Sequence, residues 1–170
     1  MLMFGMLIMF HNILVSIDGS LHSEQALSEA IDIAQAGRAR LTLITAVRSC
    51  PSWAYSPVSA GAARQLSAEF ERDAHRVMRD AVARVPDDLP VTKIITHDPI
   101  RPALQKQIET GRHDLVVMGS RGRGAVKSSV LGSVSHHTLH HSPIPVLIVH
   151  AREDEDAGDE QNPALAAHQK

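Results

Sequence analysis

The chain has 170 residues, of which 44% are hydrophobic and 21% charged, and its formal net charge is -2. These values fit one soluble globular domain and argue against a nucleic-acid binder, which would usually carry a basic face. The single cysteine, Cys50, excludes an internal disulfide and is compatible with a cytoplasmic protein.

Residues 1–8 form a hydrophobic N-terminal extension that is rich in methionine. A bilayer crossing needs about 20 apolar residues, and a signal peptide needs a basic start and a cleavage site, so the tract fits neither. We interpret it as a start codon assigned too far upstream, with a membrane or partner anchor as the alternative. The domain itself is expected over residues 9–150, with no membrane partner.

The first two predicted elements are a buried strand and an amphipathic helix. Residues 12–18 are a short, mostly apolar run that ends in a turn, as expected of a strand buried on both faces. Ser20 is a candidate N-cap for a helix whose stop signal is Gly37. A second strand is predicted over 41–47, followed by a long loop over 48–63.

The second half of the chain continues the alternation of helices and strands. Apolar residues at spacings of three and four predict a helix that includes Phe70 and Val85, and Pro86 starts the break after it. Further predicted elements are a strand over 91–96, a helix over about 100–111, a strand over 114–118, a helix over about 130–141 and a strand over 145–149. Residues 151–170 are acidic and then alanine-rich, and we expect a disordered tail.

Five strands separated by four helices predict an α/β fold with a parallel sheet covered on both faces. Right-handed crossovers place the C-terminal ends of all parallel strands at one edge of the sheet, which is where open α/β folds bind ligands. Asp18, Ala46 and Gly119 each follow or end a predicted strand. Segments far apart in the sequence therefore converge on one predicted crevice.

The glycine-rich stretch 119–133 connects the fourth strand to the next helix. Backbone N–H groups and the positive end of a helix dipole favour an anion at such a connection, and Ser133 offers a hydroxyl for a helix cap or a phosphate oxygen. The stretch is not a Walker loop, because Val126 precedes Lys127 where glycine is required. It is not a Rossmann loop either, because those glycines follow the first strand. A nucleotide cradle here must be of another kind.

The spacing of this stretch resembles that of a known family. Gly119, Gly122, Gly132 and Ser133 match Gly-x2-Gly-x9-Gly-(Ser/Thr), which the nucleotide-binding universal stress proteins carry. The opening Phe10-His-Asn-Ile-Leu-Val-Ser-Ile-Asp-Gly-Ser20 and the segment 143–149 also look like the first and last strands of that family. The resemblance covers about residues 9–150. It implies a Rossmann-like, adenine nucleotide alpha hydrolase-like fold of three layers.

The resemblance implies ATP, with Mg²⁺, as the ligand of the crevice. It assigns Asp18 to the ribose or to a phosphate-bound Mg²⁺, and the backbone of Ala46 to adenine, with Ser16 lining the same pocket. The phosphates would be held by Gly119, Gly122, Ser133 and the amide of Val134, with Gly132 allowing close approach. Alternatively, Asp18 only caps the turn before the first helix, or the glycines serve the turn alone. Direct phosphate contact and simple solvation are equally open for three cations, Arg121, Arg123 and Lys127.

Histidines crowd the fourth predicted helix, where His136 and His140 have the i, i+4 spacing of a transition-metal pair. We interpret them as a solvated face, so no metal site built from protein clusters is predicted. No catalytic group is predicted either, because Ser133 and Ser135 do not face the histidines next to them in sequence on a helix.

These observations favour a cytoplasmic, ATP-binding regulatory protein of the stress response with slow or no hydrolysis. An apolar strand over 145–149 at a sheet edge would need covering, and we expect a homodimer that pairs two such edges. A downstream protein partner is also expected. The alternatives are an ATP-independent interaction dimer of the same fold and an ATP-using adenylating enzyme.

Overall fold

A computed structural model describes residues 9–50, 60–124 and 131–151 of the chain. The predicted extension over 1–8, most of the predicted tail and part of two predicted loops lie outside these described residues. None of the helices within the described ranges combines the length and apolarity that crossing a bilayer requires.

The described residues form a five-stranded parallel sheet in the order β3-β2-β1-β4-β5. The strands are β1 (Asn12–Ser16), β2 (Arg40–Ala46), β3 (Val91–Thr96), β4 (Leu115–Gly119) and β5 (Val146–Val149). The helices are α1 (Leu21–Gly37), α2 (Ala60–Val82), α3 (Ile100–Thr110) and α4 (Ser133–His141). The predicted α/β fold is confirmed. The strand order reverses between β1 and β4, so the crevice at their C-terminal ends lies at a topological switch point.

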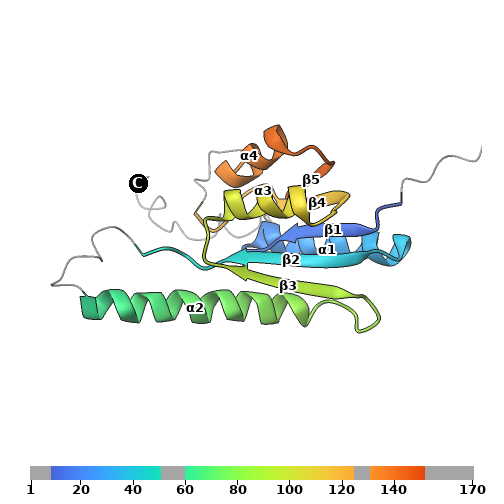
Figure 1. The fold of residues 1–170 in the computed structure, drawn as a ribbon. Coiled ribbons are helices and arrows are strands. Elements are labelled where there is room, and N and C mark those ends of the chain that lie inside the picture. Colours follow the sequence, from blue (N-terminus) through green and yellow to red (C-terminus); the bar gives the residue numbers. More distant parts are fainter. Residues whose placement is uncertain (1–8, 51–59, 125–130, 152–170) are drawn as a thin grey trace, which may run out of the picture.

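Side chains of β1 alternate between two apolar layers, as the pleat of a strand requires. Ile13 and Val15 join the cluster beneath α1 and α2, whereas Leu14 joins the cluster beneath α3 and α4. All three are fully buried, and each contributes roughly 1.5–3 kcal/mol of burial free energy. Figure 1 shows α3 and α4 on one side of the sheet and α2 on the other. The helices thus fix the sheet from both faces, and its C-terminal edge remains for a site.

Helix α1 begins after the predicted N-cap and ends at Gly37, the predicted stop signal. The Ser20 hydroxyl accepts a hydrogen bond from the Ser23 N–H at 3.3 Å, which caps the helix. Gly37 belongs to the helix, and the left-handed residue is Arg38, with φ of 51°. Gly37 also fits the packing here, because a β-carbon there would lie 3.1 Å from the Phe10 carbonyl oxygen.

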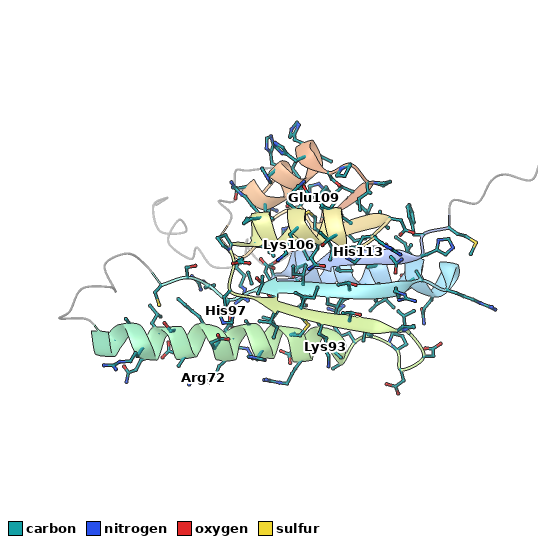
Figure 2. The ribbon with its side chains drawn as sticks, viewed as in Figure 1. Arg72, Lys93, His97, Lys106, Glu109 and His113 are labelled. Carbon is teal, nitrogen blue, oxygen red and sulfur yellow. The ribbon has the colours of Figure 1, made fainter. Side chains whose placement is uncertain are left out.

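Helix α2 begins at Ala60, so the predicted loop over 48–63 ends earlier than expected. Alanine-rich sequence near its start favours helix strongly enough that Gly61 does not prevent it. The apolar stripe predicted from Phe70 onward is buried at positions such as Val77 and Met78. Figure 1 shows the first half of α2 extending beyond the strands, and Figure 2 shows Arg72 on the side away from the sheet.

His113 lies just before β4, at the edge of the sheet opposite the crevice (Figure 2). It is packed so closely that a β-carbon on Gly111 would lie 2.3 Å from its Nε2 atom. Its two ring nitrogens are buried without a hydrogen-bond partner within the described part of the chain. Burial lowers the pKa of His113, and the charge of Asp114 opposes this only in part. The ring is therefore neutral at pH 7.

Candidate functional site

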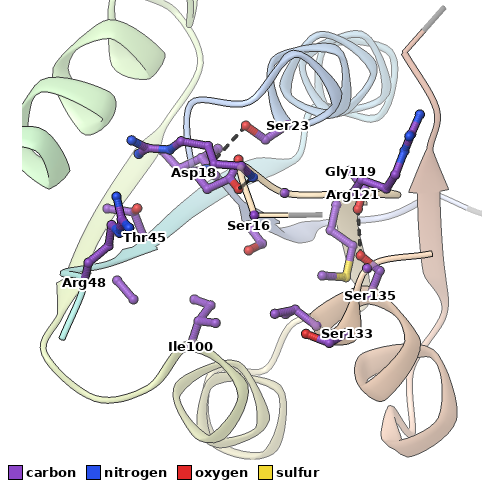
Figure 3. Close-up of a pocket in the computed structure, with 18 of the residues that line it drawn as sticks. Ser16, Asp18, Ser23, Thr45, Arg48, Ile100, Gly119, Arg121, Ser133 and Ser135 are labelled. Atoms are coloured by element: carbon purple, nitrogen blue, oxygen red, sulfur yellow. Dashed lines mark hydrogen bonds between the residues drawn. The ribbon is translucent and has the colours of Figure 1, made fainter. Parts of the chain in front are cut away.

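A cavity of about 590 Å³ lies at the C-terminal ends of the central strands. This volume falls within the range of roughly 300–1,000 Å³ that is typical of small-ligand sites. All eight residues predicted from the sequence as ligand-binding line it: Ser16, Asp18, Ala46, Gly119, Gly122, Gly132, Ser133 and Val134. The structure thus brings together the segments that were expected to converge. Figure 3 shows Ser16, Asp18, Gly119 and Ser133 around this space.

Asp18 joins the turn after β1 to the loop after β4. Its Oδ1 accepts the Ser20 N–H at 2.9 Å, and its Oδ2 accepts the Arg123 N–H at 3.0 Å. The first bond is the turn-capping role considered as an alternative for this residue. The second bond reaches another segment, so the carboxylate also positions the glycine-rich stretch. Each carboxylate oxygen has a further lone pair, and the group keeps capacity for a cation or a hydroxyl.

Two glycines of the stretch are required by packing. A β-carbon on Gly119 would lie 2.7 Å from the backbone carbonyl carbon of His22, so glycine is needed where β4 passes α1. A β-carbon on Gly122 would lie 2.5 Å from Asp18 Oδ2, and that oxygen is held by a backbone bond. These positions would demand glycine with or without a ligand.

Gly132 differs from the other two glycines. A β-carbon there would have its nearest protein neighbour at 3.4 Å, an ordinary contact, and the backbone has φ of -70°. Neither packing nor backbone conformation within the described residues therefore requires glycine at this position. A ligand that approaches the backbone closely would require it.

Helix α4 points its N-terminus into the cavity. Gly132 is its N-cap, with Ser133 and Val134 in its first turn, and all three line the cavity. The buried Ser135 hydroxyl donates to the Gly119 carbonyl oxygen at 2.8 Å, which fixes the helix against the end of β4. Partial positive charge from the helix dipole is therefore directed at the space between β1 and β4.

Several lining residues were not predicted. The end of β2 contributes Thr45, Val47 and Arg48, and the start of α3 contributes Pro99 and Ile100. Their position just after strands at the same sheet edge was the available signal. Val47, Pro99, Ile100 and Met118 give one part of the cavity an apolar lining suited to a flat ring, whereas the stretch after β4 is polar.

The cations considered in the sequence differ in placement. Arg121 and Arg123 both line the cavity, and Figure 3 shows the Arg121 side chain directed away from the space between Ser16 and Ser133. Arg123 forms an ion pair with Asp73 of α2. Lys127 lies outside the described residues.

The histidines of α4 pack against one another at the surface. The rings of His136 and His140 lie with centroids 4.5 Å apart, and those of His137 and His141 lie 4.2 Å apart. Within the described ranges, no group of three or more metal-ligating side chains is placed to hold an ion. The two pairs are consistent with the solvated face expected from the sequence.

The comparisons with known proteins agree on one family. The model of the universal stress protein family matches residues 9–150. A universal stress protein of Thermus aquaticus is 36% identical over 141 residues, which is 83% of this chain and 99% of the relative. Among solved structures, a universal stress protein from Lactobacillus plantarum has a TM-score of 0.66 and 26% identity, covering 83% of this chain and 98% of that one. A universal stress protein solved in complex with cAMP has a TM-score of 0.59 and 26% identity, covering 84% and 98%.

Proposed function

The chain belongs to the universal stress protein family, and from this premise we propose that it is a cytoplasmic ATP-binding protein. In this proposal the chain is a regulatory homodimer of the stress response, and its nucleotide state controls its interaction with a downstream protein. Hydrolysis of the nucleotide is slow or absent. The observation that carries the proposal is the meeting of the eight predicted residues in one cavity of suitable size.

The lining of the cavity favours one orientation of a bound nucleotide. The apolar part, with Val47, Ile100 and Met118, suits adenine, and the backbone at Ala46 at the end of β2 supplies polar groups for its edge. The polar stretch after β4 and the N-terminus of α4 suit phosphates. Asp18 lies just after β1, the strand between β2 and β4 in the sheet, where we place the ribose or a phosphate-bound Mg²⁺.

Gly132 gives independent support for a close ligand. Packing explains glycine at 119 and 122, whereas among the described residues packing does not require it at 132, where an N-cap favours glycine and a close ligand would demand it. The cAMP complex of a relative at 26% identity shows that an adenine nucleotide binds within this family, and it motivates the choice of adenine here.

Regulation would follow from differential binding. ATP shifts the population of the protein only if it prefers one arrangement of the stretch after β4 and the α4 terminus. Both segments also hold the end of β4, through the bonds of Gly132 N–H to Ser120 O at 2.7 Å and of Ser135 to Gly119. A ligand between them would change what this surface presents to a partner.

Titration calorimetry with ATP tests the proposal directly. We expect saturable binding of one ATP per chain, and pyrophosphate release or rapid phosphate release should not accompany it. Absence of ATP and AMP binding would instead favour the interaction dimer without nucleotide. Stoichiometric pyrophosphate release with an acceptor would favour the adenylating enzyme.

A further inference from the structure

Arg123 connects the candidate cavity to α2. Its backbone N–H donates to Asp18 at 3.0 Å, and its guanidinium Nη1 donates to Oδ2 of Asp73 on α2. Arg123 lines the candidate cavity and also a second cavity of about 200 Å³, whose other lining residues come mainly from α1 and α2. One side chain thus links the glycine-rich stretch to a helix beneath the sheet.

The Asp73 carboxylate forms ion pairs with two arginines. Its Oδ1 accepts from Arg76, one turn along α2, and its Oδ2 accepts from Arg123. The Asp73 side chain is 18% exposed, against 38% for Arg123, so the carboxylate is the less solvated partner. Partial burial raises the pKa of Asp73, but the hydrogen bonds and charges of the two arginines outweigh it and lower the pKa overall. Asp73 is therefore ionised at neutral pH and restrains Arg123.

A phosphate chain in the cavity would compete with Asp73 for the same guanidinium. Arg123 follows Gly122 in the stretch after β4, whereas the proposed adenine site is at Ala46, at the end of β2. Strand β1 lies between β2 and β4 in the sheet, so Arg123 belongs to the part of the cavity across β1 from the proposed adenine site. The outer phosphates of a long chain reach this region more readily than the single phosphate of AMP. The negative charge of Asp73 opposes those phosphates as well, because like charges repel.

We propose that Asp73 limits the preference of the cavity for nucleotides with long phosphate chains, by holding the charge of Arg123 against α2. This inference rests on the proposed function and adds a specificity determinant to it. Asp73 acts through Arg123 and is a positioning residue, whereas Arg123 would touch the phosphates.

Asp73→Asn tests the inference, because it removes the charge and keeps the shape of the side chain. The dissociation constants of ATP and AMP are measured by calorimetry for the parent and the variant. We expect ATP to bind about fivefold more tightly to the variant, while AMP changes less than about twofold. Glu69→Gln is the matched control, because Glu69 is an exposed carboxylate on the same helix and its loss should leave both constants unchanged.

Arg123→Gln examines the same contact from the other side. It should weaken ATP binding more than AMP binding, and adding Asp73→Asn to it should strengthen ATP binding less than Asp73→Asn does in the parent, because only the direct repulsion by Asp73 is then removed. A purely structural role for the ion pair would weaken ATP and AMP alike in both single variants. Thermal unfolding confirms that each variant is folded. If Asp73→Asn does not fold, an unchanged ATP-to-AMP ratio in Arg123→Gln still overturns the inference.

The two proposals fail in different ways. If the parent binds neither ATP nor AMP, the proposed function is wrong and the inference falls with it. If the parent binds both nucleotides but Asp73→Asn or Arg123→Gln leaves their ratio unchanged, the inference alone is wrong.

Discussion

Gly132→Ala separates a ligand requirement from a packing requirement. The added β-carbon would lie 3.4 Å from the Ser120 carbonyl oxygen, 3.5 Å from Arg121 Cα and 3.7 Å from Gly122 N. The backbone at Gly132 has φ of -70° and ψ of 159°, which alanine adopts without strain. Alanine is a poorer N-cap than glycine, but it also lowers the entropy of the unfolded chain, so we expect unfolding free energy to change by about 1 kcal/mol or less.

Nucleotide binding should respond much more strongly to the same change. The methyl group would stand next to the Gly122 amide, where a phosphate oxygen is expected. Loss of one charge-assisted hydrogen bond costs about 1.5–3 kcal/mol, which corresponds to roughly tenfold to hundredfold weaker ATP binding. Calorimetry with ATP and urea unfolding measure the two quantities on the same sample.

Gly61→Ala is the control, because a β-carbon on Gly61 meets no atom within 4 Å and the residue lies on α2, far from the β4 end in sequence. Unchanged ATP affinity in Gly132→Ala would refute the phosphate assignment of this glycine. Gly122→Val is a less selective test, because a β-carbon there would collide with the Asp18 carboxylate at 2.5 Å and disturb the fold as well.

Three further predictions concern stability and assembly. Because burial lowers the folded-state pKa of His113, the neutral ring favours the folded state fully above the unfolded pKa near 6.5, and this part of the unfolding free energy is lost as pH falls below it. Urea unfolding between pH 7 and pH 5 should therefore show a smaller decrease in unfolding free energy for His113→Leu than for the parent. Ser135→Ala should lower the unfolding free energy by about 1–2 kcal/mol through loss of the bond to Gly119, whereas Ser133→Ala, at an exposed position, should cost less; equal losses would contradict this. Light scattering at micromolar concentration should give a dimer mass, and a monomer would contradict pairing through β5.

The order and type of the elements were predictable because each has a strong local pattern. Strand β1 is apolar over most of its length, and α1 and α2 repeat apolar residues at helical spacing. The predicted ends of the elements were less accurate, because tertiary packing also determines where a helix begins or ends. Helix α2, for example, begins at Ala60, inside the stretch 48–63 that was predicted as a loop.

The eight candidate site residues could be named because the sheet edge, the glycine spacing and the resemblance to a known family point to the same place. Arg48 and Ile100 were missed, since neither belongs to a motif and both reach the cavity only through the strand order. Asp73 was missed for a different reason. It lies on a helix face rich in charges, which predicts a solvated surface, and only the tertiary fold brings Arg123 to it.

The glycines of the motif do not share one physical cause. Gly119 admits the α1 backbone and Gly122 admits the Asp18 carboxylate, so a relative with the same fold would need them even without a nucleotide. The room around Gly132 leaves no such need within the described residues. Sequence spacing alone cannot separate these causes, because the motif requires glycine at all three positions. A chain of this fold that has lost nucleotide binding should therefore tolerate a larger residue at the position of Gly132 before it tolerates one at Gly119 or Gly122.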